Sequence, residues 1–341
     1  MAIRNPPEYN TQLSLFSNVF TDISTRDSQE TMELPFLSLS KRTRLKPIEY
    51  QSENAKITVT GGAPYGIATI WDWDLVMWLL SQLREAIDRG EVPTRRIRFH
   101  PYKFFMAVRR NIGGIQYERF GQSLKRLKNT TVVTTVRAKR EKTVMFSWLE
   151  YGEFERDEHG RIKYVTVVIP EWLFEAVSDK RLLLTINPDY FLLTGGIERW
   201  LYRLVRKQAG SNRRGWGWYF STLHKRSGST QRFSDFSTAL RNVAAKGALL
   251  EYKLVMTKRS GHDYLSATRV STKSFPLAEV ALQNPLGLKT TTYEIAKQYL
   301  PSKDIYALED AWKKSTARNK FDIKDPDQAF LDWCRKVAKN L

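Results

Sequence analysis

The segment RSGSTQRFSDFSTALRNVAAKGALLEYKLVMTKRSGHDYLSATRV (226–270) joins a helical pattern to two strand patterns. Its large apolar residues recur at spacings of 3, 4 and 3, at Phe233, Phe236, Leu240 and Val243. This spacing predicts an amphipathic helix over 233–246. Residues 249–256 and 264–270 are rich in β-formers and flank the polar turn TKRSGHD (257–263), as in a hairpin. A helix followed by such a hairpin is one part of a winged helix.

A second helical pattern at 218–225 precedes this helix, with the break RSGST (226–230) between them. Together they predict a helix-turn-helix followed by a β-hairpin, which is the element order of a winged helix. The same order occurs earlier, where helices at 101–110 and 116–128, separated by Gly113-Gly114, are followed by β-rich segments around the basic turn RAKREK (137–142). We therefore predict an α+β fold with two tandem winged-helix domains.

Composition divides the chain into four parts. Residues 1–33 are polar, contain a Pro-Pro pair and show no sustained period, so we interpret them as a flexible tail. The two winged-helix domains are expected at 34–185 and 186–272. Residues 273–341 combine a linker containing Pro and Gly with three helical patterns, at 293–299, 304–314 and 326–338, which predict a small helical C-terminal module.

The charge of the chain is strongly positive and unevenly distributed. Its 341 residues include 55 Lys and Arg against 36 Asp and Glu, a net charge of +19. Residues 91–141 have 13 basic and 3 acidic residues, an excess of +10, and 197–273 have 16 basic and 4 acidic, an excess of +12. Each block coincides with a predicted winged helix. A nucleic acid is therefore the expected partner.

Several classes of protein are disfavoured by what the sequence lacks. There is no apolar run of about 18 residues and no apolar segment after a charged start, so we expect a cytoplasmic protein without membrane contact. The single cysteine, Cys334, excludes an internal disulfide and a cysteine zinc cluster.

Motifs for catalysis are also missing. A rolling-circle nickase needs two metal-binding histidines close together, whereas the four histidines of this sequence are isolated from one another. A helicase or loader needs a Gly-rich phosphate loop that ends in Gly-Lys-Ser/Thr, and the sequence has none. Asp72 and Asp74 are interpreted as caps of a helix that starts there. We expect a DNA-binding protein rather than an enzyme, with no cofactor and no metal.

The outward face of the predicted helix at 233–246 carries side chains that can hydrogen-bond to base edges in the major groove. These candidates are Ser234, Ser237, Thr238, Arg241 and Asn242. Flanking cations are better suited to phosphates, which add affinity without sequence information. These are Lys225, Arg226, Lys258 and Arg259. The alternative is that this face is merely solvated.

The first domain offers a corresponding set of DNA-binding candidates. They are Arg119, Ser123 and Arg126 on the helix, and Lys139 and Arg140 in the wing. The alternative for this domain is a surface for dimerisation.

The tail contains the sequence QLSLF (12–16). It resembles the short peptide that docks into the bacterial replicative sliding clamp. In such a complex Leu15 and Phe16 would fill an apolar pocket. Leu13 would support them, and Gln12 would satisfy a polar rim. The alternative is that these apolar residues attach the tail to the first domain.

Several long stretches agree in order with those of a known family. They are LPFLSLSKR (34–42), ITVTGGAPYGIATIWDWD (57–74), RIRFHPY (96–102), GGIQY (113–117) followed by LKRLKNTTV (124–132), ALEDAW (307–312) and PDQAFLDWCR (326–335). On these residues the chain resembles the replication initiator protein A family of bacterial plasmids. The resemblance implies a protein that binds repeats in origin double-stranded DNA, promotes opening and recruits the replisome, with a host initiator and helicase as further partners. Related initiators bind repeats as monomers and pair as dimers that limit copy number.

Two other functions remain open at this point. A transcriptional repressor could use the same two modules on an operator, including one at its own promoter. An enzyme with a basic channel for nucleic acid, such as a nuclease or primase, forms a third class. The clamp motif and the C-terminal module favour the initiator over a simple repressor, which needs neither.

Overall fold

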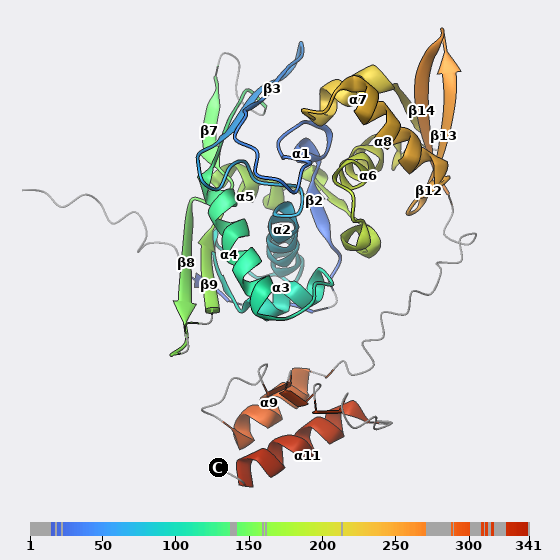
Figure 1. Cartoon of the computed structure of the whole chain (residues 1–341). Coiled ribbons are helices and arrows are strands. Elements are labelled where there is room, and N and C mark those ends of the chain that lie inside the picture. Colours follow the sequence, from blue (N-terminus) through green and yellow to red (C-terminus); the bar gives the residue numbers. More distant parts are fainter. Residues whose placement is uncertain are drawn as a thin grey trace, which may run out of the picture. The chain divides into compact units, whose positions relative to one another are not determined.

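The computed structural model divides the chain into two compact units, residues 1–274 and 275–341 (Figure 1). It describes residues 15–17, 19–21, 23–136, 142–158, 160, 162–212, 214–270, 288, 290–300, 308–309, 311–312, 315–316 and 325–339. The segments 34–185 and 186–272, expected as two domains, both lie in the first unit. Within that unit we call residues 15–185 the N-terminal half and 186–270 the C-terminal half.

The first unit contains both helices and strands. The N-terminal half contains β1 (Leu15–Phe16), β2 (Arg26–Ser28), α1 (Gln29–Glu33), β3 (Ile48–Gln51), β4 (Lys56–Gly61), α2 (Trp73–Asp88), β5 (Arg96–Phe99), α3 (Pro101–Ala107), α4 (Gly114–Asn129), β6 (Thr130–Thr134), β7 (Val144–Ser147), β8 (Tyr151–Arg156), β9 (Ile162–Val168), α5 (Glu171–Ser178), η1 (Lys180–Leu182) and β10 (Leu183–Thr185). The C-terminal half contains η2 (Pro188–Leu192), α6 (Gly196–Ala209), β11 (Trp216–Tyr219), α7 (Phe220–Ser227), α8 (Phe233–Ala245), β12 (Ala248–Leu249), β13 (Tyr252–Arg259) and β14 (His262–Arg269). The predicted mixture of helices and strands is therefore confirmed.

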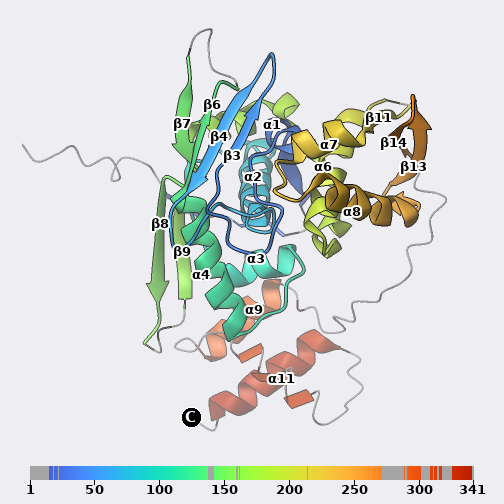
Figure 2. The same cartoon turned by 45° about the horizontal axis from the view of Figure 1, so that its top comes forward.

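The described strands of the first unit form four sheets. Their orders are β1-β5-β9-β8, β3-β4-β6-β7, β10-β2 and β11-β14-β13-β12. In both views α2 runs through the middle of the N-terminal half, with β7, β8 and β9 on one side and the C-terminal half on the other (Figures 1 and 2). Buried side chains of both halves belong to one continuous apolar core.

The two halves share a pattern of strand pairing. In the N-terminal half α2 precedes β5, α3 and α4 follow it, and β5 pairs with β9, which pairs with β8. In the C-terminal half α6 precedes β11, α7 and α8 follow it, and β11 pairs with β14, which pairs with β13. The element order that the sequence predicts twice is therefore accompanied by the same strand pairing in both halves. Strand β11 was not predicted, because its four residues adjoin α7 without a break.

The hairpin that follows α4 differs from the prediction. The sequence places it at 130–151, but β6 and β7 extend a separate sheet with β3 and β4. The hairpin that pairs with β5 comes later and consists of β8 and β9. Two hairpins rich in β-formers follow one another here, and only their long-range partners distinguish them. Lys139 and Arg140, expected in the wing, lie outside the described residues.

The expectation of a flexible tail at 1–33 is wrong for the described residues near its C-terminal end. Strand β2 pairs with β10, and α1 follows it. Asp27 and Met32 are completely buried, and Phe16, in β1 beside β5, is only 7% exposed. Composition misled because several of the buried side chains are polar. Asp27, for example, binds groups that lie far away in the sequence.

Helix α6 joins the two halves through a row of cations. These residues follow one another at four-residue intervals, so they lie on one face of the helix. Each pairs with a carboxylate of the N-terminal half. The pairs are Arg199–Asp74 at 2.7 Å, Arg203–Asp27 at 2.6 Å and Lys207–Glu33 at 2.7 Å. Three ion pairs from one helix therefore bind the N-terminal segment and α2 to the C-terminal half.

The Arg203–Asp27 pair is the most deeply buried of the three, with 2% and 0% of the side chains exposed. Arg203 also donates to the Thr31 hydroxyl at 2.9 Å, and the Trp73 indole donates to Asp27 at 2.8 Å. A buried ion pair is tolerated only when its remaining hydrogen-bonding groups are satisfied. These additional bonds meet that requirement.

Asp72 and Asp74 do not cap α2 as predicted, because α2 has no side-chain hydrogen bond at its N-cap. Asp74 instead accepts from Arg110 at 2.9 Å and from Arg199 at 2.7 Å. Asp72 accepts from two residues of α4. Both carboxylates are buried, and each binds an arginine from a distant element, while Asp72 also accepts from the backbone N–H and hydroxyl of Thr69 at 2.8 and 2.9 Å.

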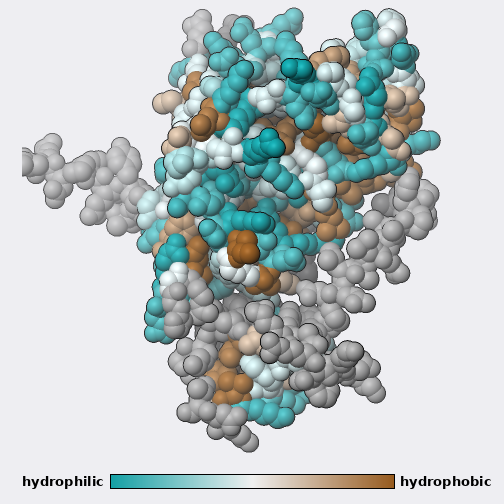
Figure 3. All heavy atoms as spheres, viewed as in Figure 1, coloured by the Kyte–Doolittle hydropathy of each residue, from teal (hydrophilic) through white to brown (hydrophobic). Residues whose placement is uncertain are grey.

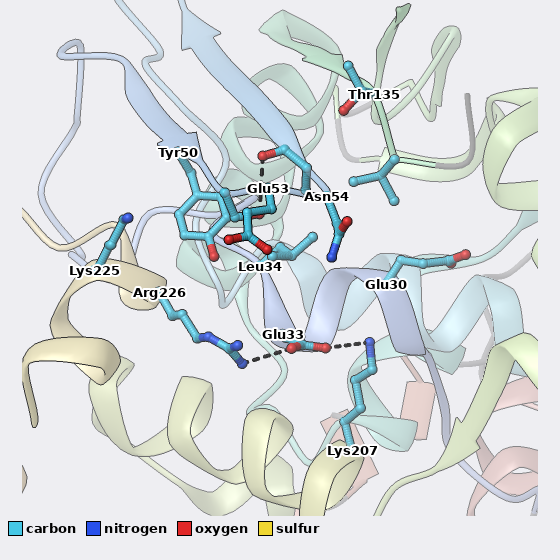
Figure 4. Close-up of a pocket in the computed structure, with 13 residues that line it drawn as sticks. Glu30, Glu33, Leu34, Tyr50, Glu53, Asn54, Thr135, Lys207, Lys225 and Arg226 are labelled. Carbon is cyan, nitrogen blue, oxygen red and sulfur yellow. Dashed lines mark hydrogen bonds and ion pairs between the residues drawn. The ribbon is translucent and has the colours of Figure 1, made fainter. Parts of the chain in front are cut away.

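Glu33, at the end of α1, lies between two cations of the C-terminal half (Figure 4). Lys207 and Arg226 each approach its carboxylate to 2.7 Å. Burial raises the pKa of Glu33, but the hydrogen bonds and charges of the two cations outweigh this effect, so its pKa lies below the ordinary value. The two ion pairs of Glu33 therefore stabilise the fold at pH values above the unfolded-state pKa of Glu33. This stabilisation is lost as the pH falls through the folded-state pKa of Glu33.

The second unit contains α9 (Thr290–Tyr299) and α11 (Pro326–Lys339). Trp312 and Cys334 lie in a separate small apolar core with residues of both helices. Helices predicted at 293–299 and 326–338 agree with α9 and α11. The third predicted helix, at 304–314, lies largely outside the described residues.

Replacing Asp27 with Asn should lower the free energy of unfolding by about 3–5 kcal/mol, because Arg203 is then buried without a counter-charge. Urea unfolding of the full chain, followed by tryptophan fluorescence, measures the change. Glu85→Gln is the control, since it removes the exposed pair with Arg89 and should cost less than about 0.5 kcal/mol. Equal losses in the two variants would contradict a special role for the buried pair.

Candidate nucleic-acid interface

Helix α8 presents an exposed row of side chains that can form hydrogen bonds. Phe236, Leu240 and Val243 are buried, so the opposite side of the helix faces outward. The exposed row consists of Ser234, Thr238, Arg241, Asn242 and Ala245. Four of these five residues were predicted as base contacts, and the structure brings them onto one face.

Ser237 was predicted in the same row, but it is only 3% exposed. It precedes Leu240 by three residues and Ala244 by seven, so it lies on the buried face of α8. Among the described residues its hydroxyl has no hydrogen-bond partner. The buried face of α8 is wider than its stripe of large apolar residues, so the apolar pattern alone did not identify Ser237 as buried.

The cations around α8 differ in their availability. Lys225, near the end of α7, is exposed and forms no ion pair within the described part of the chain. Arg226, predicted alongside it, donates to Glu33 instead. Arg241 is 46% exposed and donates to Asp263 of β14 at 2.6 Å. Arg241 is thus both at the surface and fixed in direction.

Strands β13 and β14 form a hairpin at the edge of the C-terminal half (Figure 2). Its turn consists of Ser260 and Gly261, whose φ angles of 49° and 78° are both positive, as a type I′ turn requires. Lys258 and Arg259 therefore belong to the end of β13 and not to the broad turn predicted at 257–263. Both side chains are exposed.

The corresponding hairpins of the two halves carry opposite charge. Residues 252–269 contain four Lys and Arg against one acidic residue, an excess of +3. Residues 151–168 contain three Lys and Arg against four acidic residues, an excess of −1. The hairpin of the C-terminal half is therefore the one suited to phosphates.

Helix α4 retains only part of its predicted DNA-binding set. Arg119 is exposed. Ser123 is buried and donates to Asp72 at 2.5 Å, and Arg126 donates two hydrogen bonds of 2.8 Å to the same carboxylate. The hydrogen bonds to Asp72 raise the pKa of Arg126 above its ordinary value. Lys125, which was not among the predicted contacts, is exposed and lies over the ring of Tyr65.

A cleft of about 780 Å³ separates α1 and the β3–β4 turn from α6 and α7. One wall carries Glu30, Glu33 and Glu53, and the other carries Lys207, Lys225 and Arg226 (Figure 4). Glu33 bridges the walls through its two ion pairs. With charges of both signs, the cleft is a poor site for a polyanion.

The clamp-like motif lies partly in the structure. Leu15 is 45% exposed, whereas Phe16 is in the apolar core and pairs in register with Ile97 of β5. Gln12 and Leu13 lie outside the described residues. In this arrangement Phe16 attaches the segment to the N-terminal half, which is the alternative considered for this motif.

Other kinds of site have little support in the described part of the chain. It contains no cluster of three or more potential metal ligands, and no helix there is long and apolar enough to cross a bilayer. Burial raises the pKa of the Cys334 thiol to about 11, so this thiol is a poor nucleophile. The face shown in Figure 3 is mainly hydrophilic, with hydrophobic residues in small separate patches.

Known proteins are similar to this chain in sequence and in fold. The sequence model described as "Replication initiator protein A" matches residues 26–254. A "Putative replication protein" of Wigglesworthia glossinidia brevipalpis is 30% identical over 237 residues, covering 68% of this chain and 84% of that protein. The fold is similar to that of domains 2 and 3 of RctB, with a TM-score of 0.52 at 14% identity over 68% of this chain and 94% of that one. As its long matching stretches indicated, the chain belongs to the replication initiator protein A family.

Proposed function

We propose that this initiator binds repeated sites in the double-stranded DNA of a plasmid origin through a winged helix formed by its C-terminal half. The observation that carries the proposal is that the exposed row of α8 and the basic hairpin β13–β14 occur in the same half. In winged helices the second helix of the helix-turn-helix enters the major groove, and the hairpin lies beside the backbone. Membership of the family supports the role in replication.

The exposed groups suit this division of tasks. Arg241 can donate two hydrogen bonds to guanine, and Asn242 can exchange two with adenine. Lys225, Lys258 and Arg259 can neutralise phosphates, which adds affinity at every sequence. We infer that α8 supplies the specificity and that these three cations supply most of the sequence-independent affinity.

The N-terminal half is proposed as the second winged helix, since its strand pairing matches that of the C-terminal half. Its hairpin has a net negative charge, and two of the three predicted contacts on α4 bind Asp72. Arg119 and Lys125 are exposed and would be able to contact an adjacent groove of the DNA. We infer that this half makes fewer phosphate contacts or pairs with a second protomer.

Origin opening would follow from cooperative occupancy of several repeats, which strains a neighbouring A·T-rich stretch. The protein would act in this step by binding, without catalysis, cofactor or metal. A host initiator, a helicase and the sliding clamp would then assemble at the opened site. The motif at 12–16 is proposed as the contact with the clamp.

A transcriptional repressor that uses the same surface is the second candidate, because α8 and its hairpin would bind an operator equally well. The family favours replication. Footprinting on the DNA that flanks the gene separates the two functions. An array of protected repeats is expected for the initiator, whereas a single protected operator over the promoter would indicate the repressor alone.

Asn242→Ala should weaken binding to a duplex selected by the wild-type protein from a random library by about 1–3 kcal/mol and relax one position of the site. Fluorescence anisotropy measures the affinity, and repeated selection with the variant measures the relaxation. Ser237→Ala is the matched control, since Ser237 is buried on the same helix and should leave the selected sequence unchanged. An unchanged sequence with the Asn242 variant would show that α8 does not read bases.

Lys258→Gln should reduce the salt dependence of duplex binding by about 0.9 in the slope of log affinity against log salt, which corresponds to one phosphate. Titrations at several NaCl concentrations measure the slope. Arg126→Gln should leave the slope unchanged but lower the free energy of unfolding, because it leaves the buried Asp72 unpaired. The reverse pattern would assign the phosphate contact to α4.

A peptide of residues 8–20 should bind a purified bacterial sliding clamp about 10–100-fold more tightly than the full chain. The reason is that Phe16 must first leave the core, and burial of such a side chain is worth about 1.5–3 kcal/mol. Calorimetry measures both affinities, and the same peptide with Leu15 and Phe16 replaced by Ala is the control. A wild-type peptide that does not bind would eliminate the motif, and equal affinities would contradict the cost of releasing β1.

A further inference from the structure

We propose that two consecutive residues of β14, Asp263 and Tyr264, are positioning residues that orient the two arginines of the DNA-binding surface. Asp263 holds Arg241 on the face of α8, and Tyr264 holds Arg259 near the end of the hairpin. This inference rests on the proposed function. It adds that one strand aligns the base-reading helix with the phosphate-binding hairpin.

Neighbouring residues of a strand point to opposite faces of the sheet, and this alternation separates the two contacts. Leu265 and Ala267 of β14 are completely buried, so their face of the sheet packs on the core. Asp263 lies on the same face, where it meets Arg241 of α8. Tyr264 points to the other face, where Arg259 reaches it from β13.

The contact between Asp263 and Arg241 leaves Arg241 able to read a base. One N–H of Arg241 Nη2 is donated to Asp263 Oδ2 at 2.6 Å. A guanidinium has five N–H groups, so enough donors remain for the two acceptors of a guanine. Lys258 lies directly opposite Asp263 across the hairpin. Asp263 of β14 therefore fixes the direction of Arg241, and the same strand lies beside Lys258, a proposed phosphate contact.

The contact between Tyr264 and Arg259 has a different geometry with the same consequence. The Arg259 guanidinium lies 3.9 Å from the centre of the Tyr264 ring. Stacking uses the flat face of the guanidinium and leaves the N–H groups at its edge free for a phosphate. Arg259 forms no ion pair within the described residues, so no carboxylate competes for those groups.

Gly217 of β11 leaves room for the Tyr264 ring. A Cβ atom on Gly217 would lie 2.5 Å from two atoms of the Tyr264 ring and hydroxyl, which is far closer than real contacts. Gly217 therefore lets the ring lie across β11. Tyr219, two residues further, meets the ring edge-on at 5.2 Å and 78°. The ring is supported on one side and carries Arg259 on another.

Holding both arginines in place before binding reduces the conformational entropy that is lost when DNA is bound. The two contacts should differ in what they control. Loss of the Asp263 contact should lower discrimination between sequences, because Arg241 reads a base. Loss of the Tyr264 contact should weaken binding to all sequences alike, because Arg259 binds a phosphate.

The first test compares binding of the full chain to the selected duplex and to a scrambled duplex of equal composition. Asp263→Ala should lower the ratio of the two affinities at least tenfold while strengthening binding to the scrambled duplex, since a negative charge near phosphates is removed. Asp263→Glu should restore most of the ratio. Combining Asp263→Ala with Arg241→Ala should lower the ratio little further than Arg241→Ala alone, because the two act together.

The second test measures the salt slope. Tyr264→Leu should weaken binding to both duplexes several-fold by the same factor and reduce the slope by up to about 0.9. Tyr264→Phe keeps the ring and should behave as the wild type. Arg259→Ala sets the maximum loss, and Tyr264→Leu should not exceed it.

Different outcomes would contradict the proposed DNA-binding surface and the positioning roles of Asp263 and Tyr264. If Arg241→Ala and Arg259→Ala leave duplex binding unchanged, the proposed DNA surface is wrong. If those variants act but Asp263→Ala leaves the affinity ratio unchanged, Asp263 does not position Arg241, and a raised ratio would mean that Asp263 masks Arg241. If Tyr264→Leu binds with the wild-type slope, Arg259 does not depend on the stack. Thermal unfolding confirms that each variant is folded at the assay temperature.

Discussion

The ion pair between Arg203 and Asp27 is the contact on which the arrangement of the first unit depends. It is completely enclosed, and it connects three parts of the chain: the N-terminal segment, α2 through Trp73, and α6. Removal of one partner from such a pair costs more than the pair itself contributes, because a buried charge is left behind. With the pairs of Arg199 and Lys207 above and below it, α6 cannot turn relative to the N-terminal half without breaking several contacts at once.

These contacts change how the net charge of +19 must be interpreted. The excess in each block counts cations that bind carboxylates of the same chain and are not available to DNA, such as Arg126 and Arg226. Exposed cations that form no ion pair within the described residues include Lys225, Lys258 and Arg259 around α8 and the β13–β14 hairpin, and Arg119 and Lys125 of α4. A sum over residues indicates a polyanionic partner, but only the structure shows which of the described cations already bind carboxylates of the same chain.

Local patterns in the sequence identified what local interactions determine. The apolar spacing predicted α4 and α8, because burial of one face defines an amphipathic helix regardless of what covers it. Long-range partners were not accessible in the same way. Asp72 was predicted to cap the helix that starts there, although its carboxylate binds Ser123 and Arg126 of α4, and β6 was assigned to the wrong sheet. The burial of Ser237 shows the same limit at the candidate site, since a small polar residue can complete an apolar face.

The two halves show that one pattern of pairing can carry different surfaces. Their helices and hairpins follow the same order, yet one hairpin is basic and the other has a slight excess of acidic residues. Phosphates therefore attract the β13–β14 hairpin and repel the β8–β9 hairpin. Because α6 ties both halves together through buried pairs, a C-terminal half bound to a repeat would carry the N-terminal half in a defined direction along the duplex. Under the proposed mode of binding, repeats at a regular spacing would then place successive N-terminal halves in equivalent positions, so that contacts between protomers could recur from one repeat to the next.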